Sequence, residues 1–309
     1  MNKNDAQLNT HSDDFSSALW HGGGYRHVYY KTATMLSNLQ YVLGDSLFIA
    51  AMSHYFNQWK ICHPYFDDFR NSIIQFTHVD LNWFFDEWME TTKRVDYAVG
   101  KTKHIKLKGE SAPSSSQIPN TSITFHRKGD MQMPIDFAVI TYKNDTLRYT
   151  IPNTYFAKHE KNVTVLKQWY GWDKLNESYT ASIHVPGKIK NVIIDPSYRL
   201  GDINWLNNSK KCPVYLRFDA KVNEPVDRKH YILHWRPDIW YNTTDGIKAG
   251  LHLNGNYMNY RHMFNATLWY NTGLGKSWLN DPLELVNYRI SYRTAIDKNL
   301  FVYGVGEVT

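Results

Sequence analysis

Apolar residues recur at helical spacing between Tyr25 and Trp88, and this pattern predicts four helices. In the first, over 32–44, the residues Met35, Leu39 and Val42 share one stripe, and Gly44 follows as the ending residue. Similar stripes predict helices over 45–60, 66–76 and 80–92, with Asp45 and Asp80 as caps of the second and fourth. The short connections between them favour antiparallel neighbours.

After Val95 the pattern changes to short β-rich runs that are separated by Gly, Pro, Asn or Asp. Seven such runs are expected to be strands, at 103–109, 122–130, 134–143, 146–152, 162–169, 179–187 and 190–196. This density of strands favours an antiparallel β-sandwich or a small open barrel.

A third pattern, of longer alternating runs, covers Pro237 to Thr309. In 247–257, apolar residues such as Leu251 and Leu253 alternate with polar ones such as His252 and Asn254. Strands of about 9–11 residues suit the start of an outer-membrane-type barrel, and they also suit a small soluble sheet. About four strands are expected here, whereas a closed membrane barrel needs at least about eight. Either the sheet is small and soluble, or the chain stops before a barrel closes.

These three patterns together predict an α+β multidomain chain. Residues 1–94 form the helical part, residues 95–208 the antiparallel β-sandwich, and residues 209–309 an incomplete aromatic-rich β region.

Composition narrows the function classes. The 309 residues are 42% hydrophobic and 21% charged, as expected of a folded chain, and the net charge is +6. The basic residues form no block of five or more, so no nucleic-acid partner is expected. The first fifteen residues are polar and do not resemble a signal peptide. Cys62 and Cys212 lie 150 positions apart, which excludes a C-x-x-C motif and leaves both free thiols and a disulfide open.

Complete catalytic motifs are absent from the sequence. His159-Glu160 is followed by Lys161, without the second His of H-E-x-x-H, and no C-x-x-C, G-x-S-x-G or P-loop occurs. No metal ligands are therefore expected in this chain. The stretch His21–Phe48 stands apart, because three glycines lead into a dense group of His, Tyr and Lys before a helix.

That stretch resembles the Y-x-K-G segment of the aminopeptidase N-like zinc metallopeptidases, which are gluzincins. Here Tyr29-Tyr30-Lys31-Thr32 precedes a helix that ends in Leu43-Gly44, with Thr32 in place of the family's Gly. The resemblance covers about residues 20–208 and continues, in the family's order, through Gly44-Asp45-Ser46-Leu47-Phe48, Tyr55-Phe56, Asp68-Phe69, Phe84-Phe85-Asp86-Glu87-Trp88, Met133-Pro134-Ile135, Val192-Ile193-Ile194-Asp195-Pro196 and Asp202-Ile203-Asn204.

The resemblance implies a zinc-dependent aminopeptidase that hydrolyses peptide substrates. Residues 1–94 would be the helical C-terminal half of a thermolysin-like catalytic domain, and Tyr29 would stabilise the tetrahedral oxyanion. Gly23, Gly24 and Lys31 would lie at the substrate cleft. In the family the zinc ligands precede this Tyr, so zinc is expected in the full-length protein with ligands outside this chain. The chain would then be a C-terminal part, inactive alone.

Other interpretations remain open at this point. Tyr29 and Tyr30 are also typical of rings that pack at a helix start. The chain as a whole fits a non-catalytic binding or scaffold protein derived from a peptidase. The third region adds a membrane contact through residues 237–309 as a further expectation, with a location in the bacterial cell envelope, in the periplasm or at the outer membrane.

Overall fold

The computed structural model describes residues 7–10, 26–105, 119–171, 175–220, 225–258, 261–277, 284–295 and 305–308. The chain divides into two compact units, Met1–Lys211 and Cys212–Thr309. The boundary expected between residues 94 and 95 lies inside the first unit, and the boundary expected after residue 208 lies close to the division between the units. The described part is a mixed α/β structure in which strands outnumber helices.

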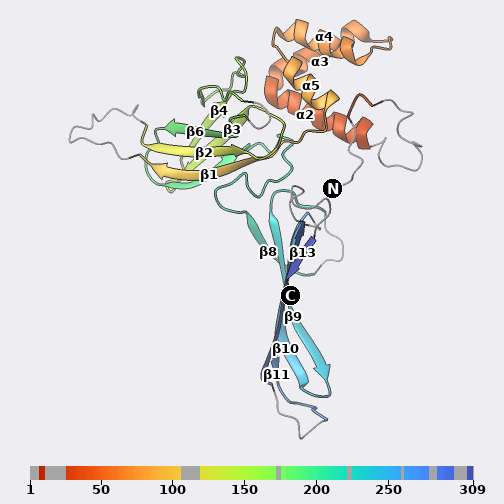
Figure 1. Cartoon of the computed structure of the whole chain (residues 1–309), viewed down its shortest axis with the longest axis vertical. Helices are drawn as coiled ribbons and strands as arrows, with labels where there is room; N and C mark the ends of the chain where they lie inside the picture. Colours follow the sequence, from red (N-terminus) through yellow and green to blue (C-terminus); the bar gives the residue numbers. More distant parts are fainter. Residues whose placement is uncertain are drawn as a thin grey trace, which may run out of the picture. The chain divides into compact units, whose positions relative to one another are not determined.

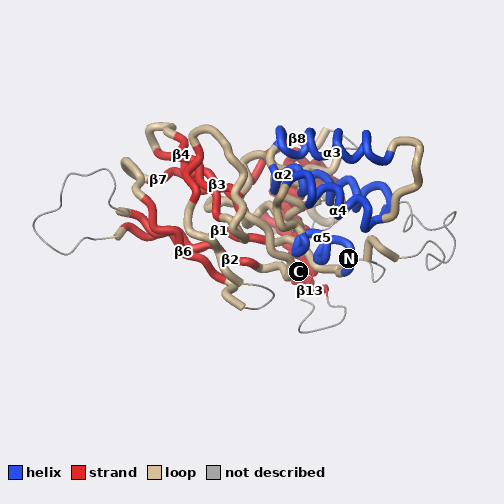
Figure 2. Tube along the Cα trace, turned by 90° about the horizontal axis from the view of Figure 1, so that it is seen from above, coloured by secondary structure: helices blue, strands red, loops and turns tan. Residues whose placement is uncertain are grey.

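The first unit begins with the helical segments, and the four expected helices are confirmed. They are α2 (Thr32–Leu43), α3 (Asp45–Trp59), α4 (Phe66–Thr77) and α5 (Asn82–Glu90), and the π-helix η2 (Arg26–Lys31) precedes them. The apolar stripes face inward, because Leu39, Ile73 and Phe84 are all fully buried. Seen from above in Figure 2, the helices gather at one end of the strands of this unit. None of the described helices combines the length and hydropathy needed to cross a bilayer.

The helix ends follow the expected capping in part. Gly44 ends α2 with a φ of 81°, a conformation that favours glycine. The expectation for Asp45 is wrong: its carboxylate is bound by Gln40 and Arg199, and α3 has no side-chain cap. The expectation for Asp80 is wrong as well: the N-cap of α5 is Leu81 and carries no side-chain cap, although the Asp80 Oδ1 accepts a hydrogen bond from the Asn82 N–H at 3.1 Å.

Two sheets follow the helices in the same unit (Figure 1). Their order is β1-β2-β6 and β5-β4-β3-β7. The strands are β1 (Tyr97–His104), β2 (Thr121–Arg127), β3 (Ile135–Thr141), β4 (Thr146–Ile151), β5 (Val163–Val165), β6 (Ser178–Ile183) and β7 (Ile189–Ile194). The expectation of a purely antiparallel arrangement is wrong at one edge, where β4 and β5 pair in parallel.

The first expected strand is displaced along the chain. β1 starts at Tyr97 rather than at residue 103, because Tyr97 and Ala98 are buried and pair with Arg127 and His126. Residues 106–109 of the expected strand lie outside the described residues.

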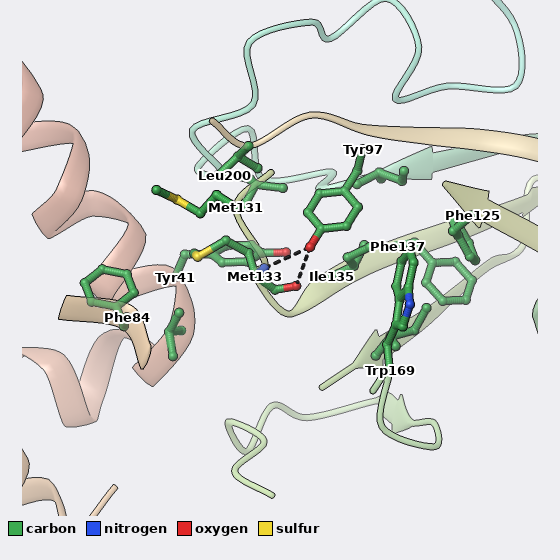
Figure 3. Close-up of a cluster of buried hydrophobic side chains, with 14 of the residues drawn as sticks. Tyr41, Phe84, Tyr97, Phe125, Met131, Met133, Ile135, Phe137, Trp169 and Leu200 are labelled. Atoms are coloured by element: carbon green, nitrogen blue, oxygen red, sulfur yellow. Dashed lines mark hydrogen bonds between the residues drawn. The ribbon is translucent and has the colours of Figure 1, made fainter. Parts of the chain in front are cut away.

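One continuous core joins the helices to both sheets. Phe125 of β2 and Phe137 of β3 meet across the sheets with ring centroids 4.6 Å apart, so the two sheets form a sandwich. Figure 3 draws the junction with the helices, where Tyr41 of α2 lies beside Met133. The Tyr97 hydroxyl donates to the Met133 carbonyl at 3.1 Å and accepts from the Met133 N–H at 2.8 Å.

The second unit is one six-stranded sheet in the order β13-β12-β11-β10-β9-β8. Its strands are β8 (Val214–Phe218), β9 (Tyr231–Asn242), β10 (Gly246–Tyr257), β11 (Arg261–Asn271), β12 (Val286–Ala295) and β13 (Val305–Val308). The expectation of about four strands after Pro237 is confirmed, because β10 to β13 and the end of β9 lie there. The sheet also extends back to Val214, where β8 pairs in parallel with β9. Cys212 at the start of this unit and Cys62 in the first are both free thiols.

Candidate functional site

Tyr29 lies on the π-helical turn η2 that leads directly into α2. Its side chain is 59% exposed, and that of Tyr30 is 64% exposed, so neither ring is part of the hydrophobic core. Lys31 ends the π-helix and is half-buried. A π-helical turn is uncommon and occurs often at functional sites, a feature that the sequence pattern did not indicate. Gly23 and Gly24 lie outside the described residues.

The helix behind Tyr29 is fixed by a buried amide. Asn38 of α2 is fully buried, and its Nδ2 donates to the Thr34 carbonyl at 2.8 Å. Its Oδ1 accepts a hydrogen bond from the Gly201 N–H at 2.9 Å. A Cβ at Gly201 would lie only 2.9 Å from the Asn38 Nδ2, so glycine allows this close approach. The segment after β7 therefore holds α2, which carries the Tyr29 turn at its start.

A lysine makes a second connection between α2 and the sandwich. The Lys158 Nζ donates to the Tyr41 carbonyl at 2.9 Å and lies 2.5 Å from the Asp136 Oδ2. The same Nζ lies 4.2 Å from the centroid of the Tyr41 ring. The Asp136 N–H donates to the Tyr41 hydroxyl at 2.7 Å. Burial, together with the charges of Asp136 and Asp195, raises the pKa of Tyr41 well above its ordinary value.

A cleft of about 700 Å³ opens beside this lysine. It is lined by the turn between α2 and α3, by parts of β3 and β4, and by residues 156–160 and 196–199. Its charged groups are largely paired: Lys158 contacts Asp136 and Glu160, and Arg199 binds Asp45. The hydrogen bonds from Arg199 lower the pKa of the Asp45 carboxyl. Tyr29 is not among the lining residues, so this cleft and the Tyr29 turn are separate features.

Asp195 holds the turn that follows β7. Its carboxylate accepts hydrogen bonds from the Ser197 hydroxyl at 2.5 Å and from the Leu200 N–H at 2.6 Å. Its φ of 45° is unusual for a residue other than glycine. Burial raises the pKa of this carboxyl in spite of the two hydrogen bonds. These contacts shape the turn after β7.

Metal ligands do not come together in the part of the chain that the structure describes. No group of three His, Cys, Asp or Glu side chains there is close enough to hold an ion. His54, one of the histidines near Cys62, stacks on Phe76 with centroids 4.7 Å apart. The donor set that a zinc ion needs, about four N, O or S ligands, is not present among these residues. Among the described residues there is therefore no set that could hold the zinc, whose ligands the resemblance places outside this chain.

Sequence reasoning missed the residues that fix this region. The sequence carried one signal for Asn38, because its polar amide lies next to the apolar stripe of the predicted helix. Lys158 and Asp136 gave none, because Lys158 is 117 positions away from the Tyr41 carbonyl that it binds.

Comparison with models of known protein families and with curated proteins finds no match for this chain. The resemblance to aminopeptidases, and the role that it gives to Tyr29, therefore remain predictions.

Proposed function

We propose that this chain is part of a zinc aminopeptidase and supplies the phenol of Tyr29 to stabilise the oxyanion formed when a peptide bond is hydrolysed. In this proposal η2 and α2–α5 are the helical half of a thermolysin-like catalytic domain. One observation carries it: the Tyr29 ring is exposed on a π-helical turn, at the start of a helix that is fixed to the sandwich.

The chemistry assigned to Tyr29 needs only its O–H. When water adds to a peptide carbonyl, negative charge builds on the carbonyl oxygen. A phenol held about 3 Å away donates a hydrogen bond that strengthens as this charge grows, so it stabilises the transition state more than the bound substrate. A fixed helix favours this role, because a donor that is already in position needs no reorganisation during the reaction.

The metal belongs to another part of the catalytic site in this proposal. Zinc held by residues outside this chain would polarise the carbonyl and activate water. The contribution assigned to this chain is confined to the phenol and to the scaffold that positions it. By itself the chain is expected to cleave no peptide.

The decisive experiment replaces Tyr29 by Phe in the complete gene product that carries these residues. Loss of one oxyanion donor is worth about 2.7–4 kcal/mol, so kcat for an aminoacyl p-nitroanilide should fall by about 100-fold or more, with little change in KM. Tyr30→Phe is the matched control, because Tyr30 is the next residue on the same turn and is equally exposed. Its kcat should stay within about twofold of the wild type. Unchanged turnover in Tyr29→Phe would remove the catalytic role.

A non-catalytic binding or scaffold role is the second candidate. Both candidates expect no metal-ligand group among the described residues, so the lack of one does not separate them. The reading frame preceding the Met1 codon separates the two proposals. An in-frame H-E-x-x-H, followed by a helix with a second Glu, supports the peptidase; a frame without these residues supports the binding role.

A further inference from the structure

The long strands of the second unit create a sheet face made of apolar residues alone. Directly opposite residues in an antiparallel ladder share a face, and Leu251 is opposite both Pro237 and Leu268. We define the apolar face as every second residue from Leu233 to Tyr241, from Ile247 to Gly255, from Phe264 to Tyr270 and from Val286 to Tyr292. All of these described positions are uncharged.

This apolar face is open to solvent within its unit. Ile239 is 76% exposed, Tyr288 74% and Leu268 55%. An antiparallel sheet normally covers its apolar side and leaves its polar side wet. A continuous exposed apolar surface of this kind marks a site that contacts another apolar body.

The opposite face carries the polar groups of the sheet beside Ile232, Trp240 and Trp269, and several of these groups bind one another. The Trp269 Nε1 donates to the Asp238 Oδ2 at 3.0 Å, and the Lys248 Nζ donates to the Asn287 Oδ1 at 2.8 Å. Lys248 is only 8% exposed. A Cβ at Gly250 would lie 2.7 Å from the Trp269 ring, so the glycine leaves room for the indole to reach Asp238. The sheet therefore satisfies its polar side internally and presents its apolar side outward.

The strand lengths match the thickness of a bilayer. β9 and β10 have 12 residues each, β11 has 11 and β12 has 10. A tilted strand needs about 9–11 residues to cross the hydrocarbon core of a bilayer.

Aromatic rings lie near both ends of the apolar face. By register, Tyr241 and Tyr270 lie toward one end, and Trp235, Phe264 and Tyr292 lie toward the other. Between them the face is mainly aliphatic, with Tyr288, opposite Leu268, as the exception. Membrane-facing strands show the same distribution, because amphipathic rings prefer the two interfaces with water.

We propose that the apolar face of β9–β12 contacts the hydrocarbon of a lipid bilayer. A folded protein is the competing partner, but protein interfaces have a polar rim around an apolar centre. Here the outermost positions of the face are largely aromatic rings, and the polar pair His262 and Thr294 follows only beyond Phe264 and Tyr292. This contact is independent of the proposed peptidase function, and it concerns residues of the second unit only.

Flotation of the full 309-residue chain with neutral phosphatidylcholine vesicles tests the proposal. The wild-type chain should float with the vesicles, and Leu268→Arg should lower the floated fraction about tenfold or more, because a charged side chain facing lipid is strongly unfavourable. Ile61→Arg is the matched control, since Ile61 is 100% exposed in the first unit and lies outside the apolar face. It should float like the wild type. Circular dichroism checks that both variants keep the wild-type strand content.

Photo-cross-linking locates the contact directly. A vesicle lipid with a diazirine in its acyl chain should label residues of the apolar face and leave Ile61 unlabelled. A wild-type chain that does not float, or a Leu268→Arg variant that floats normally, would overturn the proposal. So would a lipid-free dimer in sedimentation that Leu268→Arg dissociates, because the face would then cover a second copy of the chain.

Discussion

The sandwich of the first unit and the sheet of the second unit use the same alternating strands with opposite results. Ile123, Phe125 and Phe137 of the sandwich are at most 1% exposed, because a second sheet and the helices cover them. Ile239 and Tyr288 of the second unit are 76% and 74% exposed. Alternation decides which side chains share a face, whereas the elements packed on that face decide whether it is buried.

The largest effect is expected when one apolar side chain is shortened in each unit. Phe137→Ala should lower the free energy of unfolding of the first unit by about 3–5 kcal/mol, because Phe137 packs against Phe125 and Tyr149. Leu251→Ala in the second unit should change stability by no more than about 0.5 kcal/mol in water, since Leu251 is exposed. Urea unfolding followed by hydrogen exchange reports each unit separately. Equal losses in the two units would break the contrast.

A smaller effect is expected at the buried amide that holds α2. Asn38→Ala leaves the Gly201 N–H without its acceptor and should destabilise the first unit by about 1–3 kcal/mol. Asn57→Ala, at an exposed position of α3, is the matched control and should be within about 0.5 kcal/mol of the wild type. The midpoint of urea unfolding measures both. If the two substitutions behave alike, Asn38 does not connect α2 to the sandwich.

The smallest effect concerns the pH dependence of the first unit. Burial, and then the charge of Asp96, raises the pKa of Asp202 well above its ordinary value. A carboxyl whose pKa is raised in the folded state makes its full contribution to stability below the unfolded-state pKa of about 3.9. This contribution is lost as the pH rises through the folded-state pKa. Asp202→Asn has no such titration.

As the pH rises from about 3.5, the free energy of unfolding of Asp202→Asn should therefore increase relative to that of the wild type. The total increase should be about 1.4 kcal/mol for each unit by which the folded-state pKa exceeds the unfolded-state pKa. Asn keeps one oxygen acceptor and replaces the other by NH2, so the loss of one backbone hydrogen bond adds a pH-independent offset, and the slope with pH is the readout. Unfolding free energies at several pH values measure it. A difference that stays constant with pH would contradict the raised pKa.

Local patterns predicted the elements well, and longer-range pairing poorly. The stripe of Met35, Leu39 and Val42 gave α2 almost to the residue, because helix periodicity is a property of the segment itself. The parallel pairs β4–β5 and β8–β9 could not be predicted, since no local signal specifies which strand lies beside which. The alternation in β10 likewise indicated two faces without indicating that the apolar one stays uncovered.

The candidate site shows the same division. Tyr29 was predicted only through a resemblance, and its exposed π-helical turn had no signal in the sequence. The contacts of Lys158 with Tyr41 and Asp136 depend on three segments that meet only in the folded unit. Their chemistry was visible in the sequence, but their proximity was not.

The shared core of the first unit has a practical consequence. Tyr41 and Phe84 from the helices belong to the same buried cluster as Phe125 and Phe137 from the strands. A protease cut, a gene fusion or a recombination event placed between α5 and β1 would strip both pieces of their common interior. The helices and the sandwich can therefore be transferred to another protein, or produced in the laboratory, only together as one folding unit.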